Sequence, residues 1–183
     1  AVNGDTKVTI SGTSNGTIYG GGSNGTVGGN TAVIVSGTVT IGTSSGDVYG
    51  GGYGGSVSGN TNVTIASGGS VKNVYGGAGY VSSTSSGGTV SGNTVVTIED
   101  GGKVTQNVYG GGYGGTVGGS GDSAKGNTTV TVNGSGSGTS ATDFAAVNVY
   151  GGGFINAAGT TTVEGKATVV INGKVSGNVY GGG

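Results

Sequence analysis

The sequence predicts an all-β protein, a β-solenoid (β-helix) of about six stacked repeats of roughly 30 residues. Composition is the first reason, because 50 of the 183 residues are Gly and the aliphatic residues are almost all Val (27) and Ile (8). These β-branched residues suit a pleated surface better than a helix. Periodicity is the second reason. Gly richness without a period is typical of disorder, whereas here the same short motifs return in the same order along residues 1–183. We therefore expect a single β-solenoid repeat domain.

One motif, Val/Ile-Tyr-Gly-Gly-Gly, marks every repeat, with Ala78 as its single departure. Its tyrosines are spaced by 30, 26, 34, 41 and 30 residues and are Tyr19, Tyr49, Tyr75, Tyr109, Tyr150 and Tyr180. Because stacking places equivalent residues above one another, we expect an aromatic ladder. Tyr53, Tyr113 and Phe154 each follow four residues later and predict a second, partial ladder. The glycines have two interpretations, a wide turn or a close approach of two sheets, and we favour the close approach.

A second motif alternates with the first and predicts the principal strand of each repeat. Its copies are "DTKVTI" from Asp5, "NTAVIV" from Asn30, "NTNVTI" from Asn60, "NTVVTI" from Asn93, "NTTVTV" from Asn127 and "KATVVI" from Lys166. Apolar and polar residues alternate, so one set faces inward and the other outward. The inward set includes Val63, Ile65, Val96, Ile98, Val130 and Val132. The outward set includes a row of Thr9, Thr64, Thr97 and Thr131 that Ile34 and Val170 interrupt.

Isolated valines predict further short strands in each repeat. One group lies between the Tyr motif and the next Asn: Val27, Val57, Val90, Val117 and Val163. Another precedes the next Tyr: Val71, Val104 and Val175. Each repeat therefore has three or four short strands, and repeats stacked about 4.8 Å apart share one apolar core. The pattern leaves open whether each repeat is one large coil or two small ones. A β-prism, propeller or sandwich is the rival fold, and a propeller would show longer strands.

Asparagine repeats at two places, which predicts two further ladders. The first comprises Asn30, Asn60, Asn93 and Asn127. The second comprises Asn73, Asn107, Asn148 and Asn178, with Asp47 and Thr17 in the same register. Stacked Asn side chains satisfy backbone groups at the corners of a solenoid and bond along the stack. The Asn-Gly pairs at Asn3, Asn15, Asn24, Asn133 and Asn172 predict tight turns with positive φ.

Extra residues are confined to the links between these motifs. The ranges 79–87, 118–126 and 133–147 are longer than their counterparts in other repeats, and we expect them to be surface loops. Phe144 is the residue in them most suited to fill an apolar gap.

Residues suited to catalysis or metal binding are sparse. The chain has no His, Cys or Arg, and its seven acids are Asp5, Asp47, Glu99, Asp100, Asp122, Asp143 and Glu164. Only Glu99 and Asp100 are adjacent, and we interpret them as a solvated turn. We therefore expect no enzyme activity, no cofactor and no metal site. A net charge of −1 argues against a nucleic-acid partner. No apolar run reaches 18 residues, so we expect no membrane insertion.

The alternation of "NVYGGG", "GGTVGGNT" and "VTI..GG.V" resembles the repeats of very large secreted surface proteins of anaerobic bacteria, and is similar in style to the β-helical passengers of autotransporter-like proteins. The resemblance covers essentially the whole chain. It implies a cell-surface stalk, fibre or adhesin and an extracellular location, and it supplies no catalytic residues.

Three functions follow as hypotheses. The first is a structural stalk or head-to-tail filament, whose partners are copies of the chain or further repeats of a longer one. The chain stops at "VYGGG" in mid-repeat and starts near "DTKVTI", so one copy continues the other in phase, and the pattern leaves open a complete subunit or a fragment. The second is an adhesin or glycan-binding module that uses exposed Tyr and the insertion loops. The third is ice binding by the outward threonines.

Overall fold

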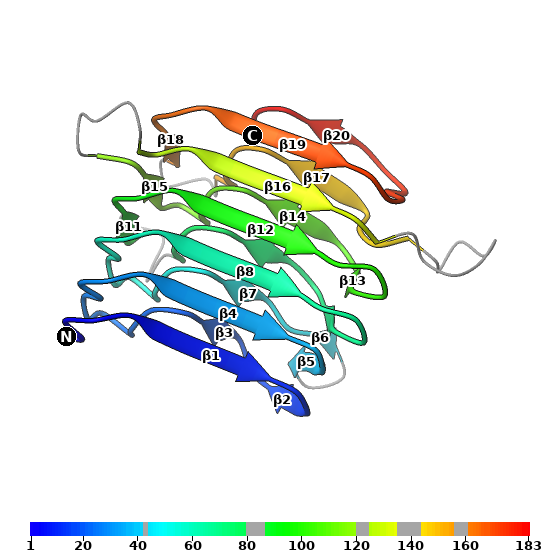
Figure 1. The fold of residues 1–183 in the computed structure, drawn as a ribbon, viewed down its shortest axis with the longest axis horizontal. Helices are drawn as coiled ribbons and strands as arrows, with labels where there is room; N and C mark the ends of the chain where they lie inside the picture. The colour runs from blue at the N-terminus through cyan, green and yellow to red at the C-terminus, as the bar shows by residue number, and fades with distance from the viewer. Residues whose placement is uncertain (42–43, 80–86, 120–124, 135–143, 156–160) are drawn as a thin grey trace.

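The chain winds into a β-solenoid in which each repeat makes one circuit, here called a rung (Figure 1). The computed structural model describes residues 1–41, 44–79, 87–119, 125–134, 144–155 and 161–183. Within these ranges the chain forms strands and turns but no helix. Its strands make four sheets, and neighbouring rungs pair in parallel in all of them.

Two six-stranded sheets form the front and back of the molecule in Figure 1. The front sheet, here called the long-strand sheet, comprises β1 (Thr6–Ile10), β4 (Thr31–Val35), β8 (Thr61–Ile65), β12 (Thr94–Ile98), β16 (Thr128–Val132) and β19 (Ala167–Ile171). The back sheet, here called the tyrosine sheet, comprises β3 (Ile18–Tyr19), β7 (Val48–Tyr49), β10 (Val74–Tyr75), β14 (Asn107–Tyr109), β17 (Asn148–Tyr150) and β20 (Val179–Tyr180).

Two smaller sheets close the sides of the coil. The corner sheet comprises β2 (Thr13–Asn15), β5 (Thr38–Ile41), β9 (Ser70–Val71) and β13 (Lys103–Val104), and β6 (Ser44–Ser45) pairs with β5 in antiparallel fashion. The side sheet comprises β11 (Thr89–Val90), β15 (Thr116–Val117) and β18 (Thr162–Val163). Isolated bridges from Val2 through Val27 and Val57 to Val90 extend the side sheet toward the N-terminus.

The register is the same between all neighbouring long strands. Val33 pairs with Val63, Val63 with Val96, Val96 with Val130, and Val130 with Val169. Each of the two six-stranded sheets receives one strand per repeat, so the repeat is one coil and not two. This settles the alternative that the sequence pattern leaves open.

The inward valines and isoleucines fill the coil. Val63, Ile65, Val96, Ile98, Val130 and Val132 are all fully buried, which confirms the predicted facing of the long strands. They join one large cluster with the inward side chains of the tyrosine and corner sheets. The inward side chains of Val27, Val57 and Val90, in the column of the side sheet, form a separate cluster. The interior therefore has a larger and a smaller part.

The first glycines of the Tyr motif pack against the first residues of the long strands. A β-carbon added at Gly76 would lie 3.0 Å from Cβ of Thr94 and would overlap the carbonyl oxygen of Gly110. Gly50 and Gly110 stand in the same relation to Thr61 and Thr128. The favoured interpretation, a close approach of two sheets, is therefore confirmed. Only Gly fits at these three positions, because a β-carbon would overlap the carbonyl oxygen of the neighbouring rung and crowd the first Thr of the next long strand.

The positive φ expected at the Asn-Gly pairs is found in only one of them. Among the five pairs only Asn24 has a positive φ, of 56°, and none of the following glycines does. Asn-Gly favours two-residue turns that reverse the chain between antiparallel strands. Here successive strands belong to different sheets of one coil, so most corners do not require that geometry. Positive φ occurs instead at Gly68 and Gly101, in the corners after β8 and β12.

The insertions are only partly within the described ranges. Residues 80–86, 120–124 and 135–143 lie outside them, so most of the three expected loops is not described. The expectation of a surface loop over 133–147 is wrong at its end, because Ala145 and Ala146 are buried in the main core cluster. Ala146 pairs with Val175 and occupies the column that Val104 fills in the preceding rung. Phe144 is half-buried.

Candidate functional site

The six motif tyrosines lie in one continuous stack. Successive ring centroids are 4.6 to 5.0 Å apart, and the ring planes lie within 11° of each other. This spacing matches the separation of neighbouring strands in a sheet. The ladder therefore follows directly from the parallel register of the tyrosine sheet, in which Tyr19, Tyr49 and Tyr75 pair in sequence.

The central rings of this stack are inside the protein. Tyr49, Tyr75 and Tyr109 expose only 8%, 4% and 5% of their surface. Burial raises the pKa of Tyr19 and of Tyr109 to about 12, and it raises the pKa of Tyr49 and Tyr75 further in the same direction. The three central rings are therefore not exposed tyrosines, and neighbouring rings cover their faces.

The second aromatic ladder is partial, and it covers the first. Tyr113 and Phe154 stack with centroids 5.1 Å apart. Tyr53 meets Tyr19 edge-on at 5.5 Å, and Tyr113 meets Tyr75 edge-on at 5.7 Å. Edge-to-face and offset stacked pairs are both favourable arrangements of aromatic rings. These side chains shield the main stack.

The first asparagine ladder runs along the N-terminal ends of the long strands. The backbone N–H of Asn60 donates to Oδ1 of Asn30 at 2.9 Å, and the same bond recurs from Asn93 to Asn60 and from Asn127 to Asn93. The ladder continues at both ends. The N–H of Asn30 donates to Oδ1 of Asp5, and the N–H of Lys166 donates to Oδ1 of Asn127, each at 2.7 Å.

The second asparagine ladder precedes the tyrosine strands. The N–H of Asn107 donates to Oδ1 of Asn73 at 3.0 Å, and the N–H of Asn178 donates to Oδ1 of Asn148 at 2.8 Å. Side-chain amides make the other links, from Asn148 to Asn107 and from Asn73 to Oδ1 of Asp47, both at 2.9 Å. One further link was not anticipated, from Nδ2 of Asn172 to Oδ1 of Asn133 at 2.9 Å. Its signal is the Asn-Gly pair that follows the long strand in both rungs.

The structure also contains a threonine ladder that the sequence did not predict. The first residue of each long strand except the last donates its hydroxyl to the first Gly carbonyl of the Tyr motif, at 2.5 to 2.6 Å. The donors are Thr6, Thr31, Thr61, Thr94 and Thr128. The last four of these are buried. In the sequence, the constant Thr after each ladder Asn is the signal, but nothing local shows that its partner is a distant Gly.

The acids are scattered over the described part of the molecule. Asp5 and Asp47 belong to the ladders, and Glu164 accepts a hydrogen bond from the N–H of Gly119 at 2.6 Å. Glu99 and Asp100 are exposed at a corner, while Asp122 and Asp143 lie outside the described ranges. Among the described residues no group of three or more His, Cys, Asp or Glu side chains is placed to hold a metal ion. In the same ranges no helix is long and apolar enough to cross a membrane.

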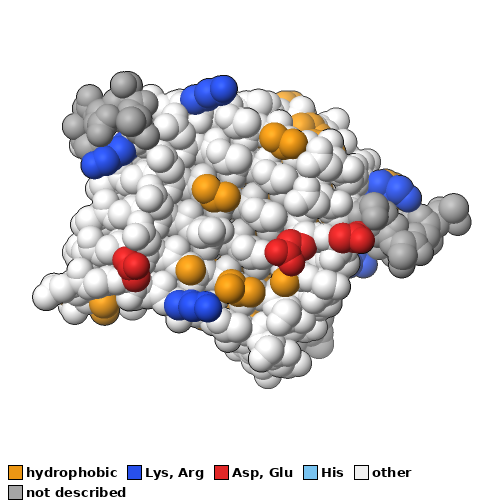
Figure 2. All heavy atoms as spheres, in the orientation of Figure 1, with side chains coloured by type: hydrophobic (Ala, Val, Ile, Leu, Met, Phe, Trp, Pro, Cys, Tyr) orange, Lys and Arg blue, Asp and Glu red, His pale blue; other side chains and the backbone are white. Residues whose placement is uncertain are grey.

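The outer face of the long-strand sheet carries two parallel rows of side chains. One row is Lys7, Ala32, Asn62, Val95, Thr129 and Thr168, and the other is Thr9, Ile34, Thr64, Thr97, Thr131 and Val170. Ile34 and Val170 interrupt the threonine row at the register that the sequence predicts. In Figure 2 hydrophobic side chains lie scattered over this face, and few side chains on it are charged.

Comparisons of the chain with protein-family models, with curated proteins and with solved structures found no match. A function therefore has to be proposed from the geometry of the molecule itself. Its most regular feature is that the inward Val, the motif Tyr, the ladder Asn and the first Thr of the long strands join one rung to the next or close a rung on itself.

Proposed function

We propose that the chain is a structural, non-enzymatic segment of an extracellular stalk or filament on a bacterial surface. One observation carries this proposal. The aromatic stack runs through all six rungs, and the polar ladders join rung to rung beside it. The residues that recur most regularly are thus engaged in stacking, as a load-carrying rod requires.

Each contact between neighbouring rungs repeats the same set of interactions. A stacked aromatic pair contributes about 0.5–1.5 kcal/mol beyond its buried area. A hydrogen bond contributes about 0.5–1.5 kcal/mol net, and the valine core adds to both. In such a repeat array stability is a sum of nearest-neighbour contributions, so length is added without any new kind of contact.

The same register also suits continuation beyond these rungs. If copies of the chain stack head to tail, β1 of one copy lies on β19 of the next, as each long strand lies on its neighbour within the chain. Further repeats of a longer chain would extend the stack in the same way. Such a contact does not close on itself, so it propagates as a filament.

The extracellular location is supported by the composition of the chain. Charged residues make up 7% of it, and Thr, Ser and Asn dominate the uncharged polar residues. The resemblance of the repeats to those of large secreted bacterial surface proteins points the same way.

Electron microscopy and sedimentation of the purified chain at micromolar concentration test the filament. We expect fibres, and we expect them to disappear when Val8 and Ile10, whose side chains face inward on β1, are both replaced by Lys. Thr9→Lys is the matched control, because Thr9 lies between them and is exposed, so its fibres should persist. A monomer at every concentration would contradict stacking of separate copies.

A further inference from the structure

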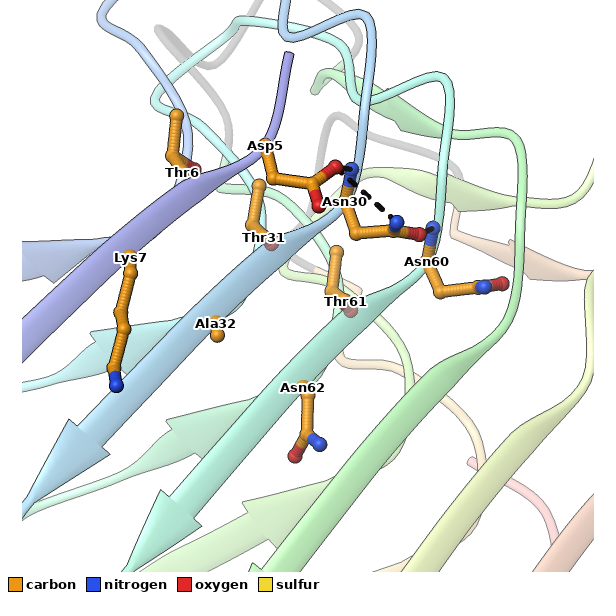
Figure 3. A pocket seen from close by; sticks show the side chains of 9 residues that line it. All are labelled: Asp5, Thr6, Lys7, Asn30, Thr31, Ala32, Asn60, Thr61 and Asn62. Carbon is orange, nitrogen blue, oxygen red and sulfur yellow. Dashed lines mark hydrogen bonds between the residues drawn. The ribbon is translucent and has the colours of Figure 1, made fainter.

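The outer face of the long-strand sheet has a hollow of about 560 Å³ that crosses β1, β4 and β8 (Figure 3). In the row that follows this face, Lys7 pairs with Ala32 and Ala32 with Asn62, so the three stand on successive strands. Figure 3 shows the long side chains of Lys7 and Asn62 extending the same way, with only the β-carbon of Ala32 between them. The small side chain of Ala32 therefore opens the hollow.

The hollow comes from the sequence of these rungs and not from the fold. In the next three rungs the same row carries Val95, Thr129 and Thr168. These side chains branch at the β-carbon and are half-buried. A β-branched residue at position 32 would fill the space in the same way.

Polar groups that both donate and accept hydrogen bonds surround the hollow. Lys7 offers the three donors of its ammonium group, and Asn62 offers a carbonyl oxygen and an NH2 group. At the N-terminal ends of the strands, Asn60 uses Oδ1 to accept from the N–H of Asn93, which leaves its NH2 group to donate outward. Asp5 accepts from the backbone N–H and Nδ2 of Asn30 through Oδ1, which leaves its second oxygen as an acceptor.

This combination suits hydroxyl groups, each of which donates and accepts at once. The positive charge of Lys7 and the negative charge of Asp5 offset each other, so the net charge of the lining favours neither an anionic nor a cationic ligand. The volume falls within the range of about 300–1,000 Å³ that is typical of small-ligand sites. We propose that this hollow binds one unit of a neutral, hydroxyl-rich saccharide.

The proposal goes beyond a structural role and does not use the tyrosine ladder. Because the hollow is open on one side, we expect binding of a single site in the millimolar range. Copies of the chain aligned in a filament would present many such hollows on one face. Weak sites held at fixed spacing bind a polymeric saccharide far more tightly than one site does.

A nuclear magnetic resonance titration of the isotope-labelled chain tests the site, in solution if the chain is monomeric and by magic-angle spinning if it forms fibres. The neutral probes are cellotriose, maltotriose, mannotriose and chitotriose, and the anionic probe is trigalacturonate. We expect at least one neutral probe to shift, saturably, the backbone amide signal of Ala32 and the side-chain amide signals of Asn60 and Asn62. If no neutral probe does so, or if the anionic probe binds more tightly than all of them, the proposal is wrong.

Ala32→Val locates the binding. The variant fills the hollow with a residue that the same row accepts at Val95, so we expect an unchanged fold and a loss of affinity of about tenfold or more. Thr129→Val, on the same row but outside the hollow, should bind as the parent does. Equal affinity of Ala32→Val and the parent would place the binding elsewhere and overturn the assignment. The fibre experiment has no bearing on either result, so the two proposals fail independently.

Discussion

Gly76 is a position where an added methyl group tests the packing between the tyrosine sheet and the long-strand sheet. In Gly76→Ala the β-carbon would lie 3.0 Å from Cβ and 3.1 Å from Oγ1 of Thr94, and it would overlap the carbonyl oxygen of Gly110. These atoms are backbone or a short branched side chain, so a rung has to move. Overpacking of this kind costs about 1–3 kcal/mol, and weakening the bond from Thr94 to Gly110 adds about 1 kcal/mol. We therefore expect a loss of about 2–4 kcal/mol in the free energy of unfolding.

The matched control is Gly12→Ala. A β-carbon at Gly12 meets no atom within 4 Å, and Gly12 does not have a positive φ. Alanine there restricts the unfolded chain and should leave stability unchanged or raise it by about 0.4–1 kcal/mol. Urea unfolding followed by circular dichroism compares the midpoints of the two variants with that of the parent. Equal midpoints for Gly76→Ala and Gly12→Ala would refute the close approach of the two sheets.

Three more predictions use the same measurement. Thr94→Val leaves the buried carbonyl of Gly110 without its donor and should lower the free energy of unfolding by about 1–3 kcal/mol. Thr97→Val on the outer face should change stability little. Equal effects of the two variants would contradict the threonine ladder. Val96→Asp buries an unpaired charge and should prevent folding or lower the midpoint severely. Val95→Asp, which faces outward on the same strand, should be tolerated. A near-parental midpoint for Val96→Asp would contradict the inward orientation of Val96. Burial raises the pKa of Tyr109 from 10.0 to about 12. As the pH rises, the unfolded chain therefore loses the phenol proton of Tyr109 before the folded chain does. Stability should therefore be constant below about pH 10 and fall as the pH rises toward 12, and midpoints that agree at about pH 9 and pH 11 would contradict the burial of the ring.

Much of this fold is visible in the sequence because its signals are local. The alternation in "NTNVTI" determines which side of the strand is apolar, and it places Val63 and Ile65 in the core without reference to any other repeat. The spacing of the tyrosines and asparagines then aligns the repeats. Identical residues at identical phases have to stack once the strands are parallel and in register.

Other features depend on contacts across the coil, and there the sequence is silent. The partner of the Thr94 hydroxyl is Gly110, 16 residues away on another sheet, and no local pattern links the two. Ala145 and Ala146 enter the core in place of larger residues, but two alanines beside a long insertion carry no periodic signal. The hollow at Ala32 likewise needs the register of three rungs, which only the structure supplies.

Immunogold electron microscopy of intact cells that make this protein tests its proposed role most directly. An antibody raised against the purified chain should label projections outside the cell, without any permeabilisation, because a stalk or filament segment is exposed there. Labelling that is absent from intact cells and emerges only after they are permeabilised would contradict the structural role at the cell surface.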